Sequence, residues 1–218
     1  MKKNLVLAAS AMALMSAFAS VAGAQPAVPE KPGHVDPAPG SRSNANSATR
    51  DALGHAVGVV SAEITTTATG FVGAAAMTDM YEIAAAQIAE TRGQSKAVKT
   101  FAATMIKDHT KTTRELTGIV SGDSKLAAVI PATLDSRHQG LIESLKGAKD
   151  ADFDDRYAEQ QVDIHNEALI VMRGYHDKGD NAALKEFAGN VENAVKMHLS
   201  MAERLDKKAD AAEKRAEK

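Results

Sequence analysis

Apolar residues recur along most of this chain with the 3.6-residue period of an α-helix. From Gly40 onward Pro131 is the only proline, so long tracts lack the residue that most strongly interrupts a helix. The pattern predicts five helices, at approximately residues 71–92, 95–121, 135–146, 152–178 and 181–207. Gly93 and the pair Gly179-Asp180 predict short turns, and residues 122–131 are predicted to form a loop.

The order of these helices predicts the fold. Two hairpins of long helices are joined by a connection of about 30 residues, which carries the short helix 135–146. Such an order is typical of the ferritin-like bundle. We therefore expect an all-α protein, a ferritin-like antiparallel four-helix bundle with one long crossover carrying a short extra helix, over residues 67–207. Composition agrees, because aromatic residues make up only 4% of the chain while the helix formers Ala and Met are frequent.

Ionisable residues interrupt the apolar stripes of the four long helices. Glu82, His109 and His198 each lie in the middle of a stripe, on the first, second and last long helix. His165 lies about 70° from the centre of the stripe on the third. We expect these side chains to point into the core, where an ionisable group needs a partner.

A metal ion is one partner that would satisfy all four side chains. Three imidazoles and one carboxylate suit Zn²⁺, Cu²⁺ or Fe²⁺. We therefore predict a single transition metal ion bound by Glu82, His109, His165 and His198. Asp108 and Tyr157 are candidates to support these ligands, and a surface charge or a backbone cap is the alternative role for Asp108.

The same residues argue against a di-iron centre. Di-iron bundles carry Glu-x-x-His on two of their helices. Here the residues three positions before the histidines are Ile106, Val162 and Val195. A carboxylate-bridged pair of irons, and ferroxidase chemistry with it, is therefore not predicted.

Two further considerations leave the metal hypothesis open at this stage. Within each hairpin, the two candidate ligands lie at different distances from the turn that joins the helices. The difference is five residues, which corresponds to about 7 Å along a helix. In addition, core Glu and His side chains can simply form hydrogen bonds with one another, or with Tyr81, Tyr157 or Gln161. On that alternative, the polar residues only specify packing.

The N-terminal region predicts export. Residues 1–24 combine Lys2 and Lys3, an apolar run and an Ala-x-Ala site, so we expect a signal peptide that is cleaved after Ala24 and a periplasmic location. Residues 25–66 are rich in Pro, Gly and Ser and predict a flexible linker; a short helix near its end is left open. Residues 208–218 predict a charged tail, as a helix extension or a frayed end.

Charge and motifs exclude several functions. After removal of the signal the net charge is about −4, which argues against binding to nucleic acid. The chain has no Cys, so thiolate ligands and Cys nucleophiles are absent. It also lacks a phosphate-binding Gly loop, a Ser nucleophile elbow and a His-Glu-x-x-His zinc motif. No transmembrane segment is predicted in the mature chain.

Several segments of the predicted bundle resemble a known bacterial family. They are Thr78-Asp79-Met80-Tyr81-Glu82-Ile83, the run from Phe101 to Thr110, Phe153-Asp154-Asp155-Arg156-Tyr157 followed by His165, and His198-Leu199. Together they resemble the exported "domain of unknown function 4142" family, whose members are often labelled outer-membrane proteins. The resemblance implies a ferritin-like bundle of no established activity, with family positions that match Glu82, His109, His165 and His198.

Two functional hypotheses follow from the sequence. The first is an exported metal-binding bundle with a role in metal buffering or stress-related redox chemistry. The second is a non-catalytic structural or interaction protein of the cell envelope, whose core Glu and His residues only form hydrogen bonds. A small-molecule hydrolase or oxidase is a third class, which would need an open pocket. Peripheral association with the envelope and a homodimer are compatible with the sequence, which specifies neither.

Overall fold

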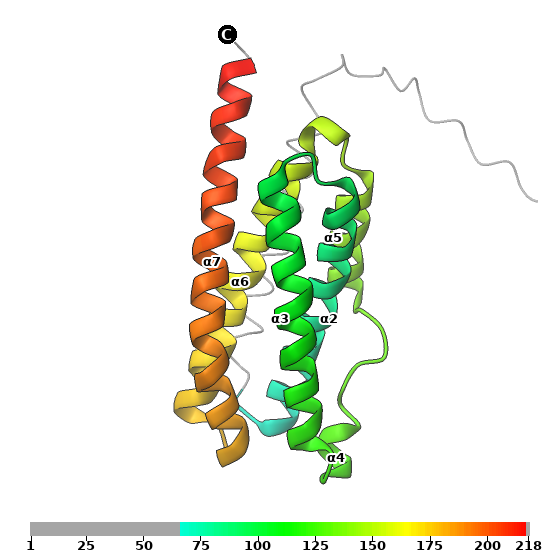
Figure 1. Cartoon of the computed structure of the whole chain (residues 1–218). Coiled ribbons are helices and arrows are strands. Elements are labelled where there is room, and N and C mark those ends of the chain that lie inside the picture. The colour runs from blue at the N-terminus through cyan, green and yellow to red at the C-terminus, as the bar shows by residue number, and fades with distance from the viewer. Residues whose placement is uncertain (1–65, 217–218) are drawn as a thin grey trace, which may run out of the picture. The chain divides into compact units, whose positions relative to one another are not determined.

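The computed structural model describes residues 66–216, and every regular element in that range is helical (Figure 1). The predicted signal peptide, and the predicted linker up to residue 65, lie outside the described residues. The elements are α2 (Ala68–Arg92), α3 (Lys96–Val120), α4 (Ser124–Ala127), α5 (Ser136–Gly147), a 3-10 turn (Asp150–Asp152), α6 (Phe153–Lys178) and α7 (Ala182–Ala216). The expected all-helical class is therefore confirmed for this part of the chain.

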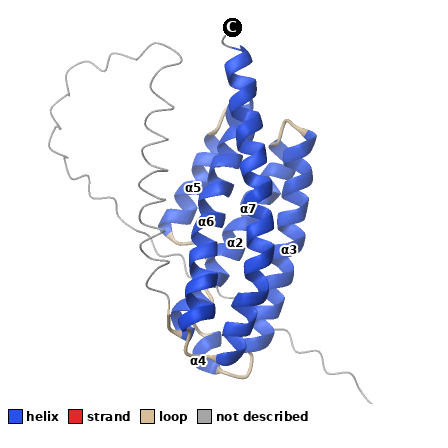
Figure 2. Ribbon diagram, turned by 90° about the vertical axis from the view of Figure 1, so that its left-hand side faces the viewer, coloured by secondary structure: helices blue, strands red, loops and turns tan. Residues whose placement is uncertain are grey.

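The four long helices form two hairpins that pack against each other. Helix α2 packs along α3 and α6 packs along α7, while α2 also contacts α6 and α3 also contacts α7 (Figure 2). The connection between the hairpins carries α4, which lies against α2 and α3, and α5, which lies against α2 and α6. The region predicted as the loop 122–131 thus contains one helical turn. Helix α7 continues without interruption to Ala216, well beyond the predicted end near residue 207.

Side-chain caps explain where three of the helices begin. The hydroxyl of Thr67 accepts a hydrogen bond from the backbone N–H of Gly70, and that of Ser95 accepts one from Val98. The carboxylate of Asp135 accepts one from the backbone N–H of His138. Each cap satisfies one of the N–H groups that the first turn of a helix leaves without a partner.

The two hairpin turns require glycine, because any larger side chain would clash with the preceding helix. A Cβ on Gly93 would lie 2.6 Å from the carbonyl oxygen of Ala89. A Cβ on Gly179 would lie 2.5 Å from the carbonyl oxygen of Tyr175 and 2.6 Å from its ring. The backbone N–H of each glycine donates to that same carbonyl and closes the preceding helix.

We expect Gly179→Ala to destabilise the protein. The buried Tyr175 ring cannot move away freely, because it stacks on Phe71 with ring centroids 4.1 Å apart. Overpacking of this kind typically costs about 1–3 kcal/mol of unfolding free energy. Urea denaturation measures the change, and Gly118→Ala is the matched control, since a Cβ there meets nothing within 4 Å. Equal losses in the two variants would contradict this account.

The apolar core is divided into two clusters. One contains Phe71, Leu116, Met172 and Val195, and the other contains Phe101 and further residues from the opposite ends of the helices. On each long helix, the residues of one cluster give way to those of the other at a buried polar residue. These residues are Glu82 on α2, His109 on α3, His165 on α6 and His198 on α7. The bundle therefore holds a polar layer between two apolar halves.

None of the described helices combines the length and the apolar character needed to cross a membrane.

Candidate metal centre

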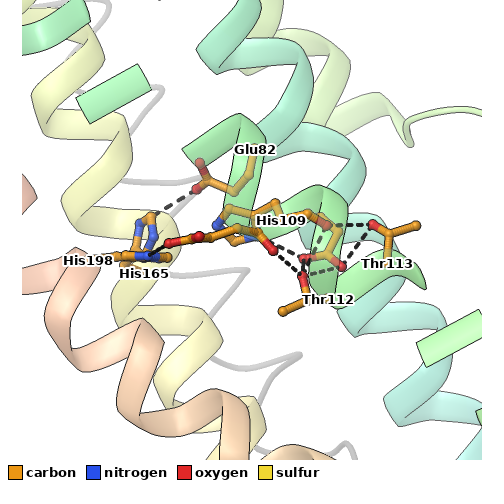
Figure 3. A network of polar contacts seen from close by, with 8 residues as sticks. Glu82, His109, Thr112, Thr113, His165 and His198 are labelled. Carbon is orange, nitrogen blue, oxygen red and sulfur yellow. Dashed lines mark hydrogen bonds and ion pairs between the residues drawn. The ribbon is translucent and has the colours of Figure 1, made fainter. Parts of the chain in front are cut away.

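Three histidines from three different helices meet inside the bundle. The ring centroids of His109 and His198 lie 5.6 Å apart, those of His165 and His198 5.5 Å, and those of His109 and His165 5.9 Å (Figure 3). One ring nitrogen from each residue lies within 4.8 Å of one from each of the others. All three side chains are buried, with His165 fully enclosed. The five-residue offset expected from the turns therefore does not keep these histidines apart.

Each of the three imidazoles is held by a hydrogen bond through one of its nitrogens. Nδ1 of His109 lies 2.8 Å from Oδ1 of Asp79, and Nε2 of His198 lies 3.1 Å from Oδ2 of Asp108. Nδ1 of His165 lies 2.8 Å from the carbonyl oxygen of Gln161, one turn earlier on the same helix. A carbonyl or an ionised carboxylate can only accept, so the bonded nitrogen in each pair carries the proton.

The second nitrogen of each ring has no hydrogen-bond partner. These atoms are Nε2 of His109, Nε2 of His165 and Nδ1 of His198, and all three are buried. With the proton fixed on the other nitrogen, each of them presents a lone pair. Histidines that bind metals typically donate their other N–H to a carboxylate or a backbone carbonyl in this way.

Asp79 is a functional candidate that the sequence analysis missed. Besides its bond to His109, it accepts hydrogen bonds from the hydroxyls of Thr112 (2.9 Å) and Thr113 (3.0 Å). These bonds hold the buried carboxylate in place behind the imidazole. The signal in the sequence was its position one helical turn before Glu82, which puts both carboxylates on the same side of α2.

Asp108 takes the supporting position that was one of its two predicted roles. Its carboxylate accepts from His198, while its side chain is 25% exposed to solvent. Asp108 on α3 therefore contacts both the buried His198 of α7 and the solvent.

Glu82 lies beside the three histidines but is not part of the group of converging nitrogens. Its Oε1 is 3.6 Å from Nδ1 of His165, and that nitrogen is already engaged by the carbonyl of Gln161. Neither carboxylate oxygen of Glu82 has a hydrogen-bond partner, and the residue is completely buried. Burial raises the pKa of Glu82 from 4.5 to about 7, although the neighbouring His109 lowers it in part.

The protonation states of two of the three histidines suit metal binding. Burial lowers the pKa of His165 well below its usual value, and the nearby His109 and His198 lower it further. Burial also lowers the pKa of His198, and so does His109. Burial likewise acts to lower the pKa of His109, but the hydrogen bond to Asp79 and the negative charges of Glu82, Asp79 and Asp108 together more than offset it, and the net pKa is raised. At neutral pH His165 and His198 are therefore neutral, as metal ligands must be.

Tyr157 and Gln161 lie near Glu82 on the same face of α6 as His165. Both are buried, and neither the hydroxyl of Tyr157 nor the side-chain amide of Gln161 has a hydrogen-bond partner of normal geometry. Burial raises the pKa of Tyr157 well above 10, and the charge of Glu82 raises it further. The other tyrosine considered as a core partner, Tyr81, is engaged elsewhere: its hydroxyl donates to Gln160 at 2.9 Å.

Within the described residues, the buried polar side-chain atoms that lack a partner all belong to this one region. They come from Glu82, His109, Tyr157, Gln161, His165 and His198. Buried polar groups in native proteins are almost always satisfied, so a concentration of exceptions calls for an explanation. The sequence raised a network of hydrogen bonds within the core as the alternative, and these atoms make no such bond of normal geometry with one another.

An all-helical protein with a buried three-histidine cluster is the class that this fold and site define. The chain belongs to the family described as Domain of unknown function (DUF4142), whose model matches residues 58–205 and so includes every residue of the cluster. The resemblance noted in the sequence is thus confirmed. No curated protein and no solved structure matches the chain.

We expect Asp79→Asn to weaken metal binding without unfolding the bundle. An amide of the same size keeps the volume but loses the negative charge that fixes the proton on Nδ1 of His109. Changes to such supporting groups typically reduce metal affinity about 10- to 100-fold. Competition with a chelator of known affinity measures the change. The control is Asp135→Asn, because Asp135 pairs with His138 at 2.8 Å in the same manner but outside the cluster; a similar loss of affinity there would contradict this role for Asp79.

Proposed function

We propose that this protein binds a single transition metal ion through His109, His165 and His198. The observation that carries the proposal is the set of three buried ring nitrogens that have no partner and belong to imidazoles meeting at one place. In each ring the other nitrogen is already committed to an oxygen acceptor. A cation is the one occupant that accepts lone pairs from all three.

The ligand chemistry favours Zn²⁺, Cu²⁺ or Fe²⁺. Imidazole nitrogen suits each of these ions, and three histidines form a known catalytic zinc set in which the fourth position is open. The unpartnered carboxylate of Glu82 lies directly beside the cluster and is the candidate to border the fourth position. Its negative charge would also compensate part of the charge of a buried divalent ion.

One ion, rather than two, fits the donors present. The cluster offers three nitrogens and one adjacent carboxylate, and the residues one turn before the histidines are apolar at positions 106, 162 and 195. A bridged pair of metals would need further carboxylates at those positions. The proposed roles are therefore metal buffering or a stress-related redox function of a single ion.

The proposed setting is a ferritin-like bundle in the periplasm. Two antiparallel helix pairs joined by one long connection support the ferritin-like topology. The charged start, apolar run and Ala-x-Ala site of residues 1–24 support export. A purely structural envelope protein is the competing proposal, and the unpartnered buried atoms count against it, since each costs about 1–3 kcal/mol of stability if nothing binds there.

Calorimetric titration of the metal-free protein tests the proposal. Addition of Zn²⁺, Cu²⁺ or anaerobic Fe²⁺ should show one saturable site for at least one of the ions. The site should disappear in His165→Ala and persist in His138→Ala, because His138 is also buried but lies on α5 outside the cluster. Titrations in which none of these ions binds the unmodified protein would refute the proposal.

A further inference from the structure

We propose that Glu82, Tyr157 and Gln161 form a binding site for an exchangeable water molecule, or a small anion of similar size, on the metal ion. This inference rests on the proposed function, because it concerns the fourth coordination position of the ion held by the three histidines. It assigns Glu82 a contact with the metal-bound molecule and gives Tyr157 and Gln161 a role in holding that molecule.

The unpartnered atoms beside the histidine nitrogens supply the first line of support. They are both carboxylate oxygens of Glu82, the hydroxyl of Tyr157, and the side-chain oxygen and nitrogen of Gln161. The set contains donors as well as acceptors, and all three residues are fully buried. A cation at this place would satisfy the oxygens only, whereas a water-sized molecule that donates and accepts would satisfy both kinds of atom.

The spacing along α6 places these groups next to the histidines. Tyr157, Gln161 and His165 follow one another at intervals of four residues, so their side chains share one face of the helix. The ring of Phe101 on α3 packs against both ends of this row, with its centroid 6.0 Å from that of Tyr157 and 6.4 Å from that of His165. This wall is apolar and offers no hydrogen bond, so the polar atoms of the row have no alternative partner on that side.

Glu82 meets His165 at the nitrogen that is already engaged. Its Oε1 lies 3.6 Å from Nδ1 of His165, which is the nitrogen already bonded to the carbonyl of Gln161 (Figure 3). A bound solvent molecule between Glu82 and the ion would use the unpartnered carboxylate oxygens while Glu82 keeps its place beside His165. A metal with three histidines and a solvent ligand keeps an open position, which distinguishes catalytic from structural sites.

Azide titration of the Co²⁺-loaded protein tests this inference, because Co²⁺ reports changes of its ligands in its visible spectrum and azide is small enough to replace bound water. The unmodified protein should bind one equivalent of Co²⁺ and show a saturable spectral change with azide. Tyr157→Phe and Gln161→Met should still bind one equivalent of Co²⁺, but their dissociation constants for azide should change at least tenfold. Tyr81→Phe is the control, because the Tyr81 hydroxyl is buried but bonded to Gln160, and it should resemble the unmodified protein.

The outcomes separate the two proposals. Binding of Co²⁺ without any spectral response to azide would overturn the exchangeable ligand and leave the metal site standing. The same azide affinity in the unmodified protein and in both variants would also overturn it. Failure of the unmodified protein to take up Co²⁺ or any of the ions named above would overturn the metal site itself.

Discussion

His109→Ala is expected to abolish the stabilisation of this protein by metal. An ion that binds only the folded state stabilises it by mass action, by about 4 kcal/mol when the free ion is at a thousand times its dissociation constant. For a helical domain of this size, that corresponds to a rise of roughly 10 °C in melting temperature. The variant loses one of only three converging nitrogens and also leaves Asp79 without its imidazole partner.

Melting curves recorded with and without added metal measure this effect. The comparison must be made within each variant, because removal of a buried side chain also changes the stability of the metal-free protein. His138→Ala serves as the control for loss of a buried imidazole, and its metal-dependent rise should remain intact. An equal rise in the unmodified protein and in His109→Ala would mean that the ion binds elsewhere.

Glu82→Gln is expected to stabilise the metal-free protein at pH 8 and to leave it nearly unchanged at pH 4.5. The folded protein holds a proton on Glu82 more tightly than the unfolded chain does, because burial raises the pKa of Glu82 from 4.5 to about 7. The contribution of this proton to the unfolding free energy is fully present below pH 4.5 and is lost as the pH rises through 7. Glutamine has no proton to lose, so the variant escapes a penalty of at most about 3 kcal/mol at pH 8.

Urea denaturation of both proteins with a chelator present, at pH 4.5 and at pH 8, gives the difference directly. His165 and His198, whose pKa values are lowered, make the protein more stable as the pH rises, but they are common to both proteins and largely cancel in the comparison. With metal added at pH 8, the unmodified protein should be the more stable of the two, because the amide lacks the negative charge that favours a nearby cation. At pH 8 without metal, Glu82→Gln should be the more stable protein. Equal or lower stability of the variant would contradict the buried position of the carboxylate.

The helices and the cluster residues could be predicted from the sequence because both depend on local periodicity. The apolar stripes predicted the starts and ends of α3 and α6 to within a residue or two. One ionisable residue stood in the middle or at the flank of each stripe, and three of these four residues meet in the fold. His165, which lay farthest from the centre of its stripe, is nevertheless fully buried among them.

What the sequence could not predict depends on the packing of helices against one another. The axial shift between α3, α6 and α7 is not written in any one helix, and so the offset of five residues left the meeting of the histidines open. The bond from His109 to Asp79 joins residues 30 positions apart on different helices. The contact of Glu82 with Nδ1 of His165 depends on side-chain conformations that periodicity does not specify.

The most direct test of the central claim is elemental analysis of the protein, purified without a histidine tag and without chelators. The account predicts close to one equivalent of a transition metal in the unmodified protein and none in His109→Ala. A metal-free protein that also shows no change in melting temperature with added iron, copper, zinc or manganese would contradict it, and the three histidines would then be a packing feature of the core.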